Sequence, residues 1–169
     1  MGPSPARSGD VLADIETPAL VVDLDVLDAN IAGMAAALAG TGIALRPHAK
    51  THKSVEIATR QLAAGAVGLC AQKVSEAEAV LASGVADLLV TNHVVGARKL
   101  DRLCDLARRV RLTTLTSDAR HVAMLSEAAT RHRVELEILI EIDAGDARMG
   151  LQQPHALPAL ARAIDGAPG

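Results

Sequence analysis

The stretch VGLCAQKVSEAEAVLASGVADLLVT, residues 67–91, decides the fold because it reads as a strand, a helix and a second strand. Its two ends, Val67–Ala71 and Leu88–Thr91, are short apolar runs of the kind that forms buried strands. The middle, Ser75–Ala82, consists mainly of good helix formers, and Ser75-Glu76-Ala77-Glu78 has the spacing of a capping box. Gly84 predicts the end of this helix. Such a unit is typical of parallel strands joined by a crossover helix.

The same alternation continues on both sides of this unit. Before it, we predict a strand at Pro18–Leu24, a helix over Asp25–Ala39, a strand at Ile43–Ala49 and a helix from the N-cap Ser54 to Ala64. After it come a helix over Arg98–Arg109, a strand at Leu112–Thr116, a helix over Ala119–His132, a strand at Leu136–Asp143 and a helix opened by Pro154. Without the strand at Pro18–Leu24 this makes five strand–helix units. They fit either an open doubly wound sheet or the first part of an eight-stranded barrel, which typically needs about 250 residues.

Composition excludes several classes of function. The chain has 169 residues, 50% of them hydrophobic and 22% charged, which suits one folded domain. It has no Phe, Trp or Tyr and a net charge of -3, so nucleic acid is not expected as a partner. No apolar run approaches the roughly 20 residues of a membrane span, and the first ten residues lack a signal-peptide pattern, which predicts a cytoplasmic protein. Cys70 and Cys104 have no zinc-site spacing, so no metal ligands are predicted here.

A basic cluster, RPHAKTHK at residues 46–53, ends one predicted strand. Alternate residues of a strand share a face, so Arg46, His48 and Lys50 project together. The carboxyl ends of strands are where α/β folds place their sites. Neighbouring positive charges favour the neutral amine of Lys50, which can attack a carbonyl and form a Schiff base. The alternative is a solvated strand end without a chemical role.

A second segment, EILIEIDAGDARMG at residues 137–150, carries acids and an arginine. Glu137, Glu141 and Asp143 share one face and could neutralise the basic cluster across a barrel interior. Two glycines flank Arg148 in the loop after the strand, which suits the presentation of a guanidinium to an anion. A surface loop with one solvated arginine is the alternative. Weaker candidates lie after the strands or in the basic cluster: His52, Gln72 and Asn92.

Four motifs carry a resemblance to a known family. They are TPALVVDLDVLDANIAGM (17–34), RPHAKTHKS (46–54), LCAQKVSEAEAVLASGVADLLVTN (69–92) and EIDAGDARMGL (141–151). Together they resemble the D-threonine aldolase and D-serine dehydratase family, pyridoxal-phosphate enzymes of the alanine racemase fold type. The third motif resembles the 3-hydroxy-D-aspartate aldolase branch in particular. The resemblance implies a barrel of which about five units are present. It assigns residues 25–169 to a partial pyridoxal-phosphate-binding α/β barrel, and residues 1–24 to an arm and strand of a missing C-terminal β-domain.

The resemblance also implies a reaction and roles for residues. Lys50 would carry pyridoxal phosphate as a Schiff base, Arg148 would lie beside the pyridoxal ring, and His48 would join them. His52, Gln72, Asn92 and Asp143 would lie around the substrate or behind these residues. The reaction would be retro-aldol cleavage of a D-β-hydroxy amino acid, 3-hydroxy-D-aspartate or D-threonine, to glycine and an aldehyde. A divalent metal such as manganese, and a homodimer, are expected only of the complete enzyme.

The sequence departs from the family in ways that keep alternatives open. The later barrel strands, which bind the cofactor phosphate, and the β-domain that carries the metal ligands are not in these 169 residues. The tyrosine that usually packs near the cofactor is absent, and Ala144, Asp146 and Ala147 differ from the commoner form of the loop. One alternative is a β-elimination of the D-serine dehydratase type on the same Lys50. Others are a non-catalytic pyridoxal-phosphate-binding protein, against which RPHAKTHK speaks, and an inactive partial domain.

Overall fold

Four parallel strands form the sheet of the computed structural model, which describes residues 6–169. They are β1 (Leu69–Ala71), β2 (Asp87–Val90), β3 (Arg111–Thr116) and β4 (Glu137–Ile140), hydrogen-bonded in that order. Every neighbouring pair is parallel, with Ala71 opposite Val90 and Thr116 opposite Ile140. This confirms an α/β fold and the predicted strand–helix alternation.

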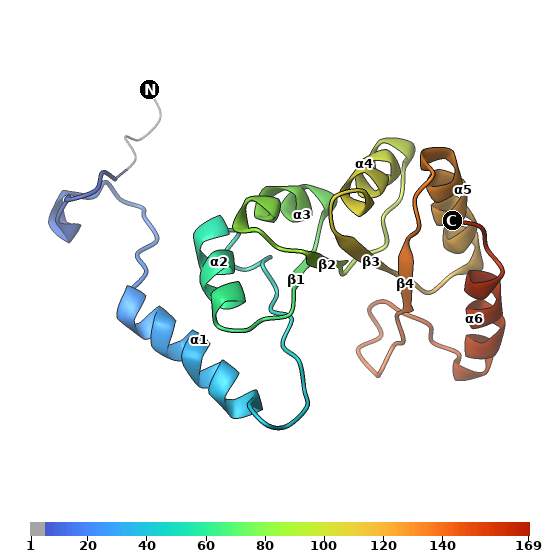
Figure 1. Cartoon of the computed structure of the whole chain (residues 1–169), viewed down its shortest axis with the longest axis horizontal. Helices are drawn as coiled ribbons and strands as arrows, with labels where there is room; N and C mark the ends of the chain where they lie inside the picture. Colours follow the sequence, from blue (N-terminus) through green and yellow to red (C-terminus); the bar gives the residue numbers. More distant parts are fainter. Residues whose placement is uncertain (1–5) are drawn as a thin grey trace.

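The helices lie along the outside of the strands, except for the first, which lies beside the second and away from the sheet (Figure 1). They are α1 (Leu24–Leu38), α2 (Val55–Ala63), α3 (Val74–Val80), α4 (Ala97–Ala107), α5 (Ala119–His132) and α6 (Leu157–Asp165). Short 3-10 turns cover Leu12–Asp14, Leu81–Ser83 and Pro154–Ala156. The core lies between sheet and helices, where Leu88 of β2 and Leu103 of α4 are fully buried. Leu139 of β4 points to the other face and is 47% exposed, so that face of the sheet lacks a covering layer among the described residues.

The strand predicted at Ile43–Ala49 is wrong as a regular strand, although its backbone runs beside β1. A single parallel bridge joins His48 to Cys70, supported by Ala49 N–H donating to the Cys70 carbonyl at 2.8 Å and Cys70 N–H donating to the Pro47 carbonyl at 2.8 Å. Pro47 has no N–H, so the next bond of the ladder cannot form. The segment still holds the position of a first strand and leads directly into the candidate site.

The strand predicted at Pro18–Leu24 is not formed in the structure either. Residues 18–23 make no sheet hydrogen bonds, and Leu24 already belongs to α1, whose N-cap Asp23 accepts the backbone N–H groups of Asp25 and Val26. A strand needs a neighbouring strand to bond with, and the described residues supply none here. Residues 1–5, which the predicted arm of residues 1–24 includes, lie outside the described part of the chain.

The predicted helix starts are correct at one place and wrong at another. Ser54 is the N-cap of α2, and its hydroxyl accepts the Ile57 N–H at 3.3 Å. The capping box at Ser75 is wrong because α3 begins earlier, with Lys73 as its N-cap. Gly84 ends the following turn in the left-handed conformation at φ 81°, as predicted. No helix within residues 6–169 combines the length and apolar character needed to cross a membrane.

Candidate functional site

A cavity of about 270 Å³ lies at the carboxyl ends of the strands and gathers most of the predicted site residues. Its polar and charged lining residues come from every strand end except that of β3: His48, Lys50, Gln72, Thr91, Glu141, Asp143, Asp146 and Arg148. Leu115 of β3 also lines the cavity. The strand register explains why these residues lie together. Ala71 pairs with Val90, so the residues that follow them, Gln72 and Thr91, lie side by side. Parallel strands thus bring residues 100 positions apart to one edge.

The two lysines of the basic cluster have different surroundings. Lys50 lines the cavity, and within residues 6–169 its amine has no carboxylate partner within 4.0 Å. Lys53 instead donates to the carboxylate of Glu76 on α3. A lysine held in an ion pair is charged and is a poor nucleophile, whereas an unpaired amine in a cavity can react. The geometry therefore favours Lys50 over Lys53 as the reactive lysine.

His48 anchors the backbone next to Lys50. Its Nδ1 accepts the Lys50 backbone N–H at 3.2 Å, so in the neutral ring the proton is on Nε2, which lies 2.9 Å from the Thr91 hydroxyl and donates to it. Thr91 in turn donates to the Ala71 carbonyl at 3.2 Å. Burial lowers the pKa of His48, and the positive charge of Lys50 lowers it further. The neutral ring is thereby favoured, and both its nitrogens are engaged in holding the Lys50 segment.

Arg148 is presented by a loop that the Asp143 side chain organises. The Asp143 carboxylate accepts the backbone N–H groups of Gly145 at 2.9 Å and Ala147 at 3.1 Å. The loop closes where Leu151 N–H donates to the Glu141 carbonyl at 2.7 Å. Arg148 lines the cavity and makes no ion pair within the described chain. Asp143 therefore acts here on the shape of the loop, and Arg148 is left available to an anion.

Gly150 is required by a close approach of two backbone segments. Its φ is 103°, and a Cβ there would lie 2.6 Å from the Asp143 nitrogen. Replacing Gly150 by alanine is expected to displace the Arg148 loop, at a cost above the roughly 1–3 kcal/mol of a strained backbone alone. Gly145→Ala is the matched control, because its φ is 125° but nothing lies within 4 Å of its Cβ. Urea unfolding of both variants measures the difference, and equal losses would contradict the steric argument.

Two of the weaker candidates do not reach this cavity. His52 Nδ1 accepts the Ser54 N–H at 3.0 Å beside the start of α2, and its ring is outside the cavity lining. The Asn92 side chain accepts the His93 N–H at 2.9 Å and faces a neighbouring hollow that it shares with Gln72 and Lys73. Sequence reasoning missed Thr91 as the partner of His48. The only signal for it was its place at the end of a predicted strand.

The predicted pairing of acids and bases inside the sheet occurs with different partners. Arg46 lies 2.7 Å from Asp87 at the start of β2 and not against the acids of β4. Glu137 pairs with Arg111 of the neighbouring strand at 2.7 Å. Glu141 lies 3.2 Å from His93. Only the Arg111–Glu137 pair joins adjacent strands. The other two contacts each reach across one intervening strand, β1 between Arg46 and Asp87 and β3 between His93 and Glu141, and none of the three is the predicted pairing of the basic cluster with the acids of β4.

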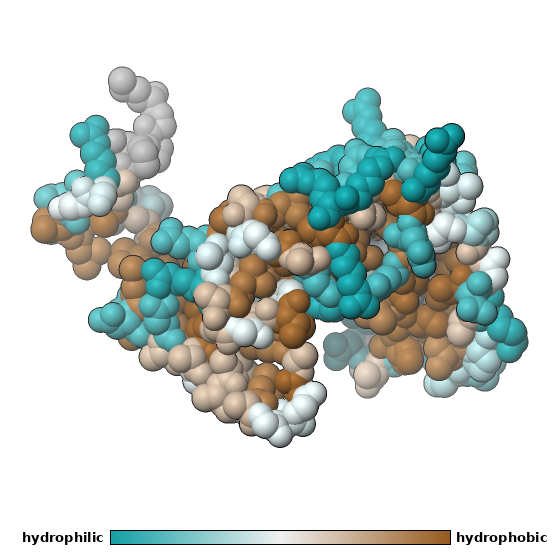
Figure 2. All heavy atoms as spheres, viewed as in Figure 1, coloured by the Kyte–Doolittle hydropathy of each residue, from teal (hydrophilic) through white to brown (hydrophobic). Residues whose placement is uncertain are grey.

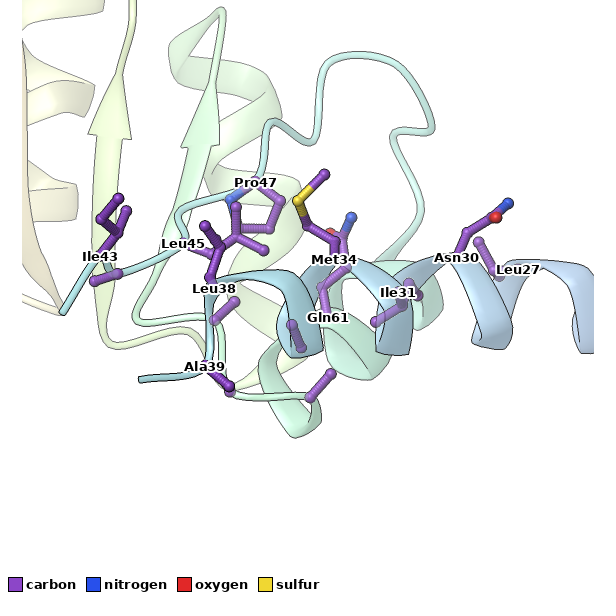
Figure 3. A pocket seen from close by; sticks show the side chains of 15 residues that line it. Leu27, Asn30, Ile31, Met34, Leu38, Ala39, Ile43, Leu45, Pro47 and Gln61 are labelled. Carbon is purple, nitrogen blue, oxygen red and sulfur yellow. The ribbon is translucent and has the colours of Figure 1, made fainter. Parts of the chain in front are cut away.

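A larger hollow of about 500 Å³ lies elsewhere, between α1, α2 and residues 43–47 (Figure 3). Its lining is apolar apart from Asn30 and Gln61 and includes no titratable side chain. Figure 2 shows hydrophobic side chains on the surface around it, and Met34 and Ile43 are more than half exposed. Without an acid, base or nucleophile this hollow is no catalytic site. Among residues 6–169 no group of three or more His, Cys, Asp or Glu side chains is placed to hold a metal ion.

Comparison with known proteins gives the family of this chain. The family described as "Alanine racemase, N-terminal domain" matches residues 22–169. The D-threonine aldolase of Arthrobacter sp. is 42% identical over 99% of this chain and 44% of its own length, and the 3-hydroxy-D-aspartate aldolase of Paracoccus denitrificans is 42% identical over 97% and 43%. The D-threo-3-hydroxyaspartate dehydratase of Delftia sp. is 38% identical over 84% and 37%.

A solved structure gives the same result in three dimensions. The crystal structure of D-threonine aldolase from Filomicrobium marinum superposes with a TM-score of 0.93 at 43% identity, covering 98% of this chain and 45% of that one. The match confirms the barrel-type fold over the open doubly wound sheet. The chain spans less than half the length of the curated relatives it matches. The resemblance seen in its motifs is confirmed, and the chain belongs to the family of the alanine racemase N-terminal domain.

Proposed function

We propose that this chain is the cofactor-binding part of a lyase that cleaves D-β-hydroxy amino acids with pyridoxal phosphate. The substrate would be D-threonine or 3-hydroxy-D-aspartate, and the products glycine and an aldehyde. One observation carries the proposal: the amine of Lys50 and the guanidinium of Arg148, neither in an ion pair within residues 6–169, line one cavity at the carboxyl ends of parallel strands. The similarity to relatives named as aldolases for these two substrates supports it.

The donor set of the cavity fits the chemistry of this cofactor. Pyridoxal phosphate has an aldehyde, which an amine such as that of Lys50 can bind, and a phenolic oxygen, which a guanidinium such as that of Arg148 can neutralise. When bound, it supplies an electron sink for the pair released as the Cα–Cβ bond breaks. Strands beyond β4 would have to supply the phosphate site, and a divalent metal would belong to the complete protein.

The residues of this chain have positioning roles in the proposed reaction. His48 holds the Lys50 backbone and Asp143 shapes the loop of Arg148. Neither His48 nor His52 is assigned as the base that takes the β-hydroxyl proton. Both nitrogens of His48 are engaged, and His52 lies outside the cavity.

A second candidate reaction uses the same residues. The relative named D-threo-3-hydroxyaspartate dehydratase is also similar over most of this chain, and loss of the β-hydroxyl needs the same amine and electron sink. Within residues 6–169 both reactions would use the same Lys50 and Arg148. Assaying aldehyde and keto-acid products of the complete protein would decide between them.

Three further features are proposed for the whole protein. Residues 1–24 would form an arm that joins a second, β-rich domain, in line with the exposure of Leu20, Val21 and Val22. The complete enzyme would be a homodimer acting on a small amino-acid substrate. A cytoplasmic location is in line with the two free thiols, Cys70 and Cys104.

Borohydride trapping tests the proposed function directly. The chain is incubated with pyridoxal phosphate, reduced and digested, and the labelling of its four lysines is followed by peptide mapping. Lys73 and Lys99 are exposed, as Lys50 is, but they line the neighbouring hollow and not the cavity of Arg148. We expect Lys50 to be labelled at least about tenfold faster than either, because its cavity orients the cofactor for reaction. Lys50→Arg should remove this fast label. Labelling of Lys50 no faster than that of Lys99, or labelling of Lys53 alone, would overturn the proposal.

A further inference from the structure

The turn that carries Lys50 ends at a residue with an unusual backbone. Lys53 has φ 50°, in the left-handed region that lysine seldom adopts, and its N–H closes the turn by donating to the Ala49 carbonyl at 2.8 Å. Lys50 lies inside this turn, so its direction depends on how Lys53 is held. His48 fixes the turn at its start, through the Lys50 N–H. A side-chain contact from Lys53 lies at the other end of the turn.

Glu76 supplies that contact and also reaches the next strand. One oxygen of its carboxylate accepts the Lys53 amine, and the other accepts the Gln72 backbone N–H at 3.0 Å. The Glu76 side chain is only 12% exposed. Burial alone would raise the pKa of Glu76, but the hydrogen bonds from Lys53 and Gln72 outweigh it and leave the pKa below its usual value. The carboxylate is therefore charged and bridges the Lys50 turn to the end of β1.

We propose that Lys53 and Glu76 form a positioning pair that fixes the turn carrying Lys50 against the end of β1, where Gln72 lines the same cavity. This inference rests on the proposed function for the role of Lys50. It gives the second lysine of the basic cluster a task of its own, which is to orient the first. The Lys53 amine binds the Glu76 carboxylate from the side of the turn, and the same carboxylate binds the Gln72 backbone N–H at the end of β1.

The chain offers a matched control for this pair. Glu78 lies two residues after Glu76 on the same helix and pairs with Arg102 of α4, away from the cavity lined by Lys50. Arg102→Met removes an ion pair of α3 without touching the turn. Lys53→Met removes the proposed pair, and Lys53→Arg keeps the positive charge and the hydrogen-bonding capacity.

Hydrogen exchange tests the pair without any cofactor. In Lys53→Met, the amides of residues 50–53 should exchange on the order of fivefold faster than in the unsubstituted chain. Lys53→Arg should restore slow exchange, and Arg102→Met should leave these amides unchanged. Glu76→Gln should additionally speed the exchange of the Gln72 amide. Unchanged exchange at residues 50–53 in Lys53→Met, or equal acceleration in Arg102→Met, would overturn the proposal.

Trapping with pyridoxal phosphate and borohydride connects the pair to the site. The labelling rate of Lys50 should fall several-fold in Lys53→Met, recover in Lys53→Arg and stay unchanged in Arg102→Met. An unaltered Lys50 rate in Lys53→Met would overturn the positioning role. If Lys50 is not labelled preferentially even in the unsubstituted chain, the proposed function fails, and the exchange experiment still decides whether the pair fixes the turn.

Discussion

Replacement of Arg148 by lysine is expected to lower kcat/KM for D-threonine by about 100-fold, the scale on which removal of one positioned charge-stabilising donor acts. Lysine keeps the charge but loses the planar fork of donors that fits an anionic oxygen or a carboxylate. Folding should be unaffected, because Arg148 is exposed and makes no ion pair within residues 6–169. The loop keeps its shape through Asp143, which is unchanged.

The measurement needs the strands that follow β4. A chimera provides them, in which residues 1–169 replace the matching part of the Arthrobacter D-threonine aldolase, to which they are 42% identical. Aldehyde release is then compared between the chimera and its Arg148→Lys form. Arg98→Lys is the control, because Arg98 is an exposed arginine of α4 outside the cavity. Nearly normal kcat/KM in the Arg148→Lys chimera would mean that Arg148 is only a solvated loop residue.

Periodicity predicted the helices well where a cap and a core face agreed. α5 begins and ends at the predicted residues, Ala119 and His132, because Asp118 caps its first turn and Arg133 leaves the helix in the left-handed region. The start of α3 was predicted wrongly from the Ser75 motif. Val74 is 4% exposed and packs in the core as the first residue of the helix. Ser75 therefore lies inside the helix and cannot act as its N-cap. A capping pattern contains no information on burial of the residue before it.

The candidate site could be predicted only where one segment carries it. Lys50 and Arg148 stand out because each belongs to a local motif, although the role of Arg148 beside the cofactor was implied by the family resemblance and not by the loop alone. Thr91 does not, since its hydrogen bond to His48 joins positions 43 residues apart and depends on the pairing of three neighbouring segments. The Lys53–Glu76 contact depends in the same way on how α3 approaches the turn. Such contacts require the register of the sheet, which a single sequence does not reveal.

Residues 1–169 expressed alone should associate and should not release aldehyde from D-β-hydroxy amino acids. β4 is the last strand of the sheet, so its free edge can pair with another chain. Apolar surface adds to this tendency, since Leu139 is 47% and Ile142 50% exposed and no residue of α1 is buried. Light scattering would measure the association, and a coupled assay with pyridoxal phosphate and manganese would measure turnover.

A charged substitution on β4 tests whether association occurs through its free edge or results from general instability. Leu139→Lys places a lysine on the bare face of β4 and should reduce the scattering mass, because charged edge strands resist pairing. Met124→Lys is the matched control: Met124 is 38% exposed and lies on helix α5, not on the edge strand, so the substitution should leave association unchanged. Equal effects of both substitutions would indicate nonspecific hydrophobic association instead of pairing at the edge of β4. A monodisperse monomer that releases aldehyde would contradict the interpretation of this chain as a partial barrel. A sheet that ends at β4 would then contain a complete catalytic site.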